Sequence, residues 1–184
     1  MNTQKLAQTK LGRVFVRTMA RIMESRLRYR FFGPVRILQD AEIRPGQAVL
    51  EVGCGTGFFT LPAARRLGDQ GSLVAMDVLP ESVEAVTRKM QAADVRNVRV
   101  VRGDALDTRM PAGSFDAALI FGVIPAPMLP MDRLLAEMHR VLKPGGVMAV
   151  WPPSGVNRRI VASGLFAISS RRNGVWNYKR TQRS

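Results

Sequence analysis

Residues 48–60, which read Ala-Val-Leu-Glu-Val-Gly-Cys-Gly-Thr-Gly-Phe-Phe-Thr, constrain the fold of this chain more than any other stretch. Val49, Leu50 and Val52 give this stretch the apolar, β-branched composition of a strand that is buried on both faces. Three glycines follow at alternate positions: Gly53, Gly55 and Gly57. A helix is expected next over residues 61–67, with Gly68 as its stop. A strand, a bare turn and a helix N-terminus together predict a ligand site, because free backbone N–H groups would point out of the turn.

The spacing of these glycines points to a particular ligand. A dinucleotide-binding turn requires G-x-G-x-x-G, and Phe58 stands where its third glycine would be. An acid precedes the glycines instead, giving Glu51-x-Gly53-x-Gly55-x-Gly57. This pattern resembles the first motif of the class I S-adenosylmethionine-dependent methyltransferases. In that family the turn lies under the amino-acid part of the cofactor, and the acid helps to order the turn and the cofactor's ammonium group.

A second acid follows the next predicted strand, Ser72–Asp77. An acid at the carboxyl end of the adjacent parallel strand can accept hydrogen bonds from both hydroxyls of a ribose. The alternative is a solvated aspartate that caps the following helix, expected over residues 81–92 and preceded by Pro80. The family resemblance favours the ribose role for Asp77.

A third acid, Asp104, closes a strand predicted from Val98, and the family places such an acid beside the adenine amino group. The alternative is a polar loop residue. The resemblance implies one set of cofactor-binding residues: Glu51, Gly53, Gly55, Gly57, Asp77, Val78, Asp104, Ala105 and Phe121. Phe121 ends the fourth predicted strand, Phe115–Phe121, and Asp116 near the start of that strand is expected to be structural.

The loop at residues 122–130 is apolar and lacks the Asn-Pro-Pro-Tyr type of motif that amino-group methyltransferases carry. It also lacks histidine. We expect it to form a hydrophobic wall for a small-molecule or lipid-like acceptor, although core packing would explain the same composition. His139, the only histidine, is expected on the surface of a helix over residues 131–142. No catalytic residue is assigned.

The remaining pattern completes a Rossmann-like three-layer α/β sandwich. A short helix is expected over residues 35–43, a fifth strand over residues 147–151 and a helix near residues 157–163. Strands over residues 165–170 and 175–180 would form a hairpin with Asn173-Gly174 at its turn. We therefore predict one methyltransferase domain with a seven-stranded, mostly parallel sheet and an antiparallel last strand. A basic helical extension, residues 1–44, would precede the core, residues 45–184.

The positive charge is concentrated at the two ends of the chain. The formal net charge is +14, while residues 45–154 carry as many acids as bases. Apolar residues between Lys10 and Phe32 recur at roughly helical spacing among arginines, which predicts a basic amphipathic helix. The charge indicates an anionic partner, which could be a membrane surface, nucleic acid or an acidic substrate. An RNA methyltransferase that binds phosphates through its basic ends is the alternative to a small-molecule or lipid enzyme.

The cysteine content, the histidine content and the hydropathy of the chain limit the cellular compartment and the kinds of metal site that can be expected. A single cysteine, Cys54, allows no intramolecular disulfide and fits a reducing compartment. One histidine and one cysteine leave no plausible zinc site, so no metal is expected. No apolar run is long enough to span a bilayer, and Met1–Lys10 lacks the apolar core of a signal peptide. We expect a cytoplasmic protein, with peripheral membrane association left open.

Overall fold

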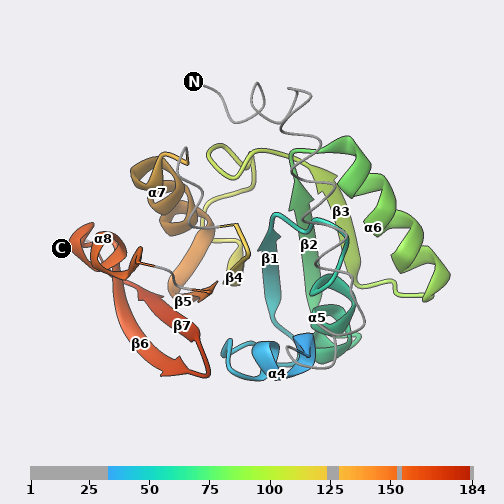
Figure 1. The fold of residues 1–184 in the computed structure, drawn as a ribbon, viewed down its shortest axis with the longest axis horizontal. Coiled ribbons are helices and arrows are strands. Elements are labelled where there is room, and N and C mark those ends of the chain that lie inside the picture. Colours follow the sequence, from blue (N-terminus) through green and yellow to red (C-terminus); the bar gives the residue numbers. More distant parts are fainter. Residues whose placement is uncertain (1–32, 124–128, 153–154, 183–184) are drawn as a thin grey trace.

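Seven strands form one mixed sheet in the order β3-β2-β1-β4-β5-β7-β6 (Figure 1). The computed structural model describes residues 33–123, 129–152 and 155–182. The strands are β1 (Ala48–Val52), β2 (Ser72–Asp77), β3 (Val98–Arg102), β4 (Phe115–Phe121), β5 (Leu142–Trp151), β6 (Phe166–Arg172) and β7 (Val175–Arg180). The helices are α4 (Pro34–Gln39), α5 (Thr60–Leu67), α6 (Pro80–Ala92), α7 (Met131–Val141) and α8 (Asn157–Ala162). The predicted amphipathic helix before Gly33 lies outside the described residues, as does most of the apolar loop.

Strand directions confirm the predicted fold class. Strands β1 to β5 pair in parallel, whereas β7 is antiparallel to β5, and β6 is antiparallel to β7. The hairpin turns at Asn173 and Gly174, whose φ angles of 44° and 82° both lie in the left-handed region. Two such residues in succession are the signature of a type I′ turn, the predicted tight connection.

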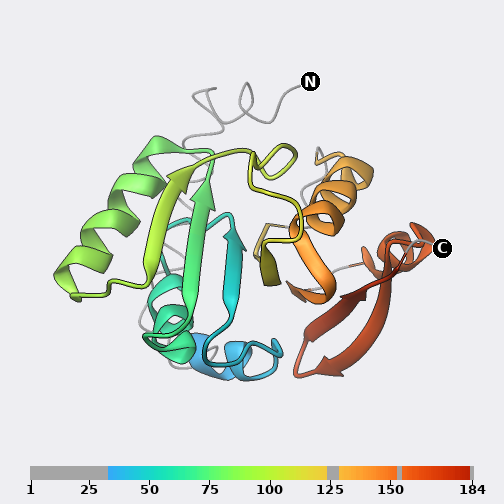
Figure 2. The same cartoon turned by 180° about the vertical axis from the view of Figure 1, so that it is seen from behind.

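Helices cover both faces of the sheet (Figures 1 and 2). Successive side chains of a strand point to opposite faces, so neighbouring residues of β1 enter different cores. Val49 packs in the core that α4 and α5 cover, and Leu50 packs in the core that α7 and α8 cover. The central strands read as near-continuous apolar runs because both of these faces are buried. Within the described residues, no helix is both long and apolar enough to cross a membrane.

Two element boundaries differ from the sequence-based expectation by more than two residues. The first helix ends at Gln39 rather than residue 43, because the chain turns through Glu42 with a φ of 53°. Strand β5 begins at Leu142 rather than Val147, since Leu142 already pairs with Phe115 before a register shift.

The prediction that His139 lies on the surface is wrong. His139 is 9% exposed, its Nε2 lies 3.0 Å from the Thr181 carbonyl oxygen, and its ring packs edge-on against Phe166. The cause is tertiary, because the β6–β7 hairpin packs over the end of α7 and covers this side chain.

The structural role predicted for Asp116 is confirmed. One carboxylate oxygen accepts a hydrogen bond from the Ala48 amide at 2.8 Å, and the other contacts Lys143 Nζ at 2.7 Å. These contacts join the starting ends of β1, β4 and β5, at the edge of the sheet opposite the glycine turn.

Candidate functional site

The glycine turn folds back over the end of the neighbouring strand. The last residues of β1 and β2 lie side by side, with Val52 paired to Met76. The amides of Gly53 and Cys54 both donate to the Met76 carbonyl oxygen, at 2.8 and 3.0 Å. The turn and the end of β2 therefore form one unit at the carboxyl edge of the sheet, where ligands bind in open α/β folds.

Asp77 connects this turn to helix α6. Its Oδ2 accepts a hydrogen bond from the Gly55 amide at 2.9 Å, and its Oδ1 accepts one from the Leu79 amide at 3.0 Å. The side chain is 9% exposed, and burial raises the pKa of Asp77 against the lowering effect of these backbone donors. Asp77 thus orders the turn and the start of the helix, and its contact with a ribose stays a prediction.

Glu51 is the second buried acid at this edge. It is 3% exposed, and its Oε2 accepts a hydrogen bond from the Thr60 hydroxyl at 2.7 Å. Burial raises the pKa of Glu51 to about 8. A carboxyl group in this state is best compensated by a cationic partner, since a nearby positive charge favours the ionised form.

The raised pKa of Glu51 predicts a specific dependence of stability on pH. Between its ordinary value of 4.5 and about 8, the folded protein holds a proton that the unfolded chain releases. Glu51's contribution to stability is therefore fully present below pH 4.5 and is lost as the pH rises to about 8. The stability of the wild type relative to Glu51→Gln should fall over this window, by at most about 1.4 kcal/mol per pH unit.

Denaturant unfolding of both proteins at pH 5, 6, 7 and 8 measures this difference. The glutamine can still accept the Thr60 hydrogen bond, so the variant is expected to fold. A difference between the two proteins that stays constant over these pH values would show that Glu51 is ionised throughout.

The three glycines of the turn have different surroundings. A Cβ at Gly55 would meet no atom of the described residues closer than 4.0 Å, whereas one at Gly53 would lie 2.6 Å from Val123 Cγ2. At Gly57 the nearest atom would be Val86 Cγ2 on α6, at 3.2 Å. Gly55 is therefore the position where the backbone is bare toward the outside, while Gly57 allows close packing against the helix.

The turn's own amides are largely engaged within the protein. Besides Gly53 and Cys54, the amide of Gly55 donates to Asp77 and that of Gly57 donates to the Cys54 carbonyl oxygen at 2.8 Å. The expectation of free N–H groups is therefore not met at these four residues, because the end of β2 and the turn itself supply their acceptors.

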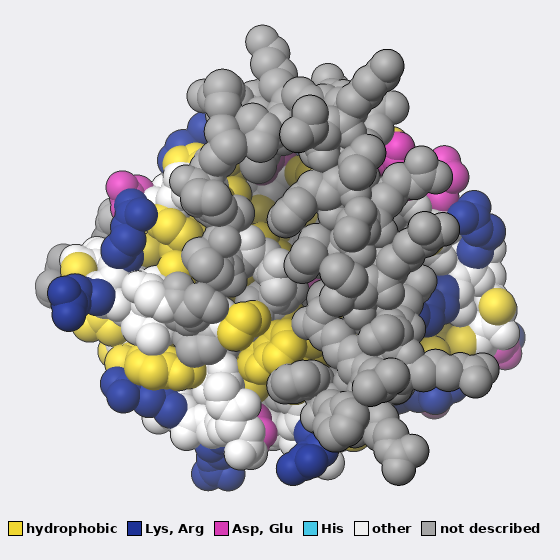
Figure 3. Space-filling view, in the orientation of Figure 1, with side chains coloured by type: hydrophobic (Ala, Val, Ile, Leu, Met, Phe, Trp, Pro, Cys, Tyr) yellow, Lys and Arg dark blue, Asp and Glu magenta, His cyan; other side chains and the backbone are white. Residues whose placement is uncertain are grey.

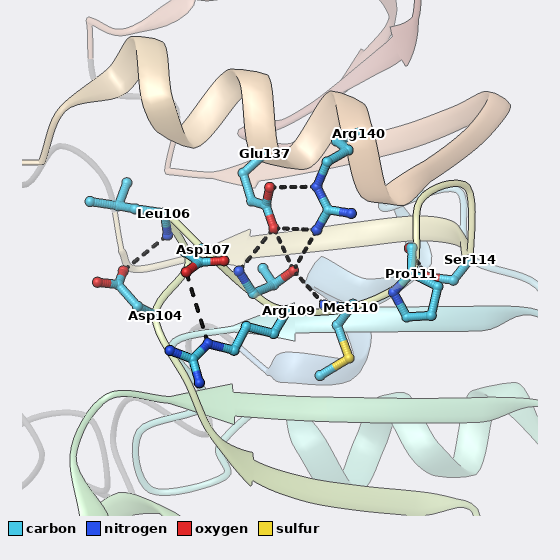
Figure 4. Close-up of polar contacts among 10 residues, drawn as sticks. Asp104, Leu106, Asp107, Arg109, Met110, Pro111, Ser114, Glu137 and Arg140 are labelled. Carbon is cyan, nitrogen blue, oxygen red and sulfur yellow. Dashed lines mark hydrogen bonds and ion pairs between the residues drawn. The ribbon is translucent and has the colours of Figure 1, made fainter.

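Asp104 lies beyond the end of β3, at the rim of a hollow of about 830 Å³ that Val78 and Gly103 also line. Its Oδ1 accepts a hydrogen bond from the Leu106 amide at 2.9 Å (Figure 4). No residue in the described part of the chain donates to its second oxygen. Ala105 is half-buried against the core that α7 covers. Asp104 therefore lies at the edge where an adenine is expected, and its second carboxylate oxygen has no hydrogen-bond donor among the described residues.

The structure brings most of the predicted residues together, but two of them turn inward. Glu51, Gly53, Gly55 and the acids Asp77 and Asp104 lie along the carboxyl edge of β1 to β3, together with Val78. Gly57 packs against α6. The Phe121 side chain is 4% exposed and packs edge-on against Phe59, with 4.9 Å between ring centroids.

Two contributors to the site escaped the sequence reasoning. Thr60 is the hydrogen-bond partner of Glu51, and Lys89 Nζ on α6 donates to the carbonyl oxygens of Gly57 and Thr56, at 3.2 and 3.4 Å. Helical spacing was the available signal for Lys89, which follows the buried Val86 by three residues and so shares its face.

The described residues give no sign of metal or thiol chemistry at this edge. In that part of the chain, no group of His, Cys, Asp and Glu is placed to hold a metal ion. Cys54 is buried, and desolvation raises the pKa of its thiol. A thiol in this state is a poor nucleophile, which fits a small residue that fills a tight turn.

Comparison with known proteins gives a consistent result. A family model described as a methyltransferase domain matches residues 49–146. The chain is 35% identical to nocamycin O-methyltransferase from Saccharothrix syringae over 126 aligned residues. This alignment covers 67% of this chain and 44% of that protein. The chain is 36% identical to demethylmenaquinone methyltransferase from Staphylococcus aureus over 116 aligned residues. This alignment covers 61% of this chain and 46% of that protein. The chain thus spans less than half the length of these curated relatives.

The fold also matches solved structures. An S-adenosylmethionine-dependent methyltransferase from Aquifex aeolicus superimposes with a TM-score of 0.76 at 20% sequence identity. The alignment covers 89% of this chain and 96% of that one, so the similarity extends across both folds.

Proposed function

Because this chain belongs to the class I S-adenosylmethionine-dependent methyltransferase family, we propose that it transfers the cofactor's methyl group to a small-molecule or lipid-like acceptor. One observation carries the proposal: a bare turn at Gly55 lies between two buried carboxylates, Glu51 and Asp77. The names of the two curated relatives, for nocamycin and demethylmenaquinone, support the small-molecule acceptor.

The residues at this edge fit the cofactor chemically. Burial raises the pKa values of Glu51 and Asp77, so a cationic ligand with hydroxyl groups would satisfy both acids. Glu51 would face the ammonium group, Asp77 would accept from the ribose hydroxyls, and the second oxygen of Asp104 would accept from the adenine amino group. Val78 and Ala105 would contact the adenine ring. No metal is part of this proposal.

The chain's contribution to the reaction is mainly one of placement. S-adenosylmethionine, when bound, supplies an electrophilic methyl group together with its own leaving group. The protein holds the cofactor at one fixed position, so that an acceptor atom can approach in line with the bond that breaks. Next to the turn, the buried ring of Phe59 packs edge-on against the rings of Phe121 and Trp151.

Calorimetry with S-adenosylhomocysteine tests the cofactor assignment, with NAD as the control ligand. We expect binding of the first and none of the second. A chain that binds NAD but not S-adenosylhomocysteine would contradict the proposal. A crystal grown with S-adenosylhomocysteine would then show the space beside the sulfur atom, which outlines the acceptor.

A second candidate function, RNA methylation, is favoured by the charge of the C-terminal segment. Exposed arginines lie on α8 and β6, on the side of the molecule where blue side chains gather at the left of Figure 3. They are Arg158, Arg159, Arg171 and Arg172. The Arg171 guanidinium carbon also lies 4.0 Å from the Trp176 ring centroid, and residues 155–184 contain no acid. Cationic and aromatic side chains of this kind are used to bind nucleic acid.

Co-sedimentation with liposomes and with RNA, each at two salt concentrations, separates the two functions. A lipid-like acceptor predicts partitioning onto both neutral and anionic vesicles, with weak RNA binding. Strong RNA binding that falls steeply with salt, without partitioning onto neutral vesicles, would favour RNA methylation.

A further inference from the structure

We propose that Glu137 is a positioning residue for adenine recognition, because it holds the loop that carries Asp104 at the cofactor-binding edge. The proposal rests on the proposed function, since it assumes that Asp104 contacts the adenine. Glu137 itself is not expected to touch the cofactor.

The loop that carries Asp104 has little backbone structure of its own. Residues 103–114 join β3 to β4 without a helix or a strand, and their one ladder contact is an isolated bridge between Asp104 and Asp107. Backbone hydrogen bonds tie its ends to the fold, from the Gly103 amide to the Asp77 carbonyl oxygen at 3.0 Å and from the Gly113 amide to that of Arg140 at 2.9 Å. Between these ends, the position of the segment depends on contacts that its side chains make with the rest of the fold. Glu137 provides these contacts at Thr108.

Glu137 projects from α7 toward this loop (Figure 4). Its Oε1 accepts two hydrogen bonds from Thr108, from the amide at 2.8 Å and from the hydroxyl at 2.6 Å. Glu137 is 9% exposed and Thr108 is 4% exposed, so water competes little for these bonds. One carboxylate therefore fixes both the backbone and the side chain of Thr108.

Arg140 fixes the orientation of Glu137 in turn. Its Nε donates to Oε2 at 2.8 Å and its Nη2 donates to Oε1 at 2.7 Å, a two-point contact that sets the carboxylate plane. The Arg140 hydrogen bond is the largest cause that lowers the pKa of Glu137 to about 2. Glu137 thus stays charged at neutral pH and accepts from Thr108 at full strength.

The residues between Thr108 and Asp104 complete the connection. Leu106, which lies between them, is 8% exposed and packs in the core that α7 covers. Its amide donates to Asp104 Oδ1. The segment is therefore held by β3 at one end, by Leu106 in the middle and by Glu137 at the other end. None of the described residues donates to the second oxygen of Asp104, which could therefore accept from the adenine amino group.

The test compares two ligands that differ at position 6 of the purine and, as a consequence, in the hydrogen that the 6-oxo form carries on N1. S-adenosylhomocysteine carries the amino group, whereas S-inosylhomocysteine has an oxygen in its place. Calorimetry with the wild type should show a preference for the adenine ligand. In Glu137→Gln, an amide nitrogen faces the Arg140 donors, so we expect about tenfold weaker binding of S-adenosylhomocysteine. Binding of S-inosylhomocysteine should change much less, so the preference should largely disappear.

Glu84→Gln is the matched control. Glu84 also lies on a helix and forms an ion pair with an arginine, Arg88, at 3.7 Å, but that pair is exposed on the surface of α6. We expect this variant to keep the wild-type preference. Amide hydrogen exchange gives a second measurement, because the amides of Leu106 and Thr108 should exchange faster in Glu137→Gln alone.

The outcomes distinguish this inference from the proposed function. If the wild type fails to bind S-adenosylhomocysteine, the proposed function is wrong. If the wild type discriminates between the ligands and a folded Glu137→Gln variant discriminates equally well, the positioning role is wrong. Should Glu137→Gln not fold, Thr108→Val replaces it. This variant removes the hydroxyl that donates to Glu137 and that also accepts from the Met110 amide at 3.2 Å and from Arg140 Nη2 at 3.4 Å. A roughly threefold smaller preference in Thr108→Val would support the role, and an unchanged preference would overturn it.

Discussion

Gly55→Ala is expected to weaken S-adenosylhomocysteine binding about a hundredfold while reducing stability by only about 1–2 kcal/mol. Within the part of the chain that the structure describes, the new methyl group would meet no atom closer than 4.0 Å, so it would project into the space where the ligand is proposed to lie. The loss of stability comes from the φ of +53°, a conformation that alanine adopts with strain. Calorimetry and denaturant unfolding of the same preparation measure the two effects.

Gly57→Ala is expected to have the opposite balance of effects, with a larger loss of stability and a smaller loss of affinity. Its methyl group would lie 3.2 Å from Val86 Cγ2 and 3.5 Å from Lys89 Cδ, so the buried Val86 side chain on α6 would have to move by a few tenths of an ångström. We expect a loss of about 2–4 kcal/mol in stability and less than a tenfold change in affinity for the folded molecules. Gly113→Ala serves as the control, because Gly113 lies away from the site and has a similar φ of +62°, and a Cβ there would meet none of the described atoms within 4 Å. Wild-type affinity in Gly55→Ala would place the ligand elsewhere.

Asp77→Ala is expected to weaken cofactor binding by ~1–3 kcal/mol, the range for a lost hydrogen bond to a charged group. The structure predicts a second effect of this substitution, on the stability of the folded protein. Without the carboxylate, the amides of Gly55 and Leu79 lose their acceptors in a buried setting, which should reduce stability by another ~1–3 kcal/mol. Calorimetry and unfolding again separate the two effects.

Asp77→Asn provides the comparison for this prediction. The amide oxygen of asparagine can accept from one of the two backbone N–H groups, but its nitrogen would face the other. We expect stability between that of the wild type and that of Asp77→Ala, with affinity reduced in both variants. A folded Asp77→Ala variant with unchanged affinity would contradict the ribose contact.

The sequence predicted the elements well because local signals mark them. Apolar runs that end in acids gave β1 and β2, and glycine or proline marked the start or the end of α4, α5 and α6. The register that brings Glu51 and Asp77 to one edge also follows from parallel pairing of successive strands.

Contacts between distant segments could not be predicted in the same way. The burial of His139 depends on where the β6–β7 hairpin packs, which no local pattern encodes. Glu137 was missed although it follows the buried Leu134 by three residues, because a glutamate in an amphipathic helix is normally solvated. Its buried partner Thr108 comes from a loop without periodicity, so the sequence offered no sign of the pairing.

The internal hydrogen bonds of the glycine turn have a consequence for how a ligand is recognised. The amides of Gly53, Cys54, Gly55 and Gly57 are satisfied before any ligand arrives, so the loss of conformational entropy occurs during folding rather than on association. The turn is thus preorganised, and its backbone should superimpose closely in the free and ligand-bound states. Differences in affinity among variants at this edge should therefore appear mainly in the dissociation rate.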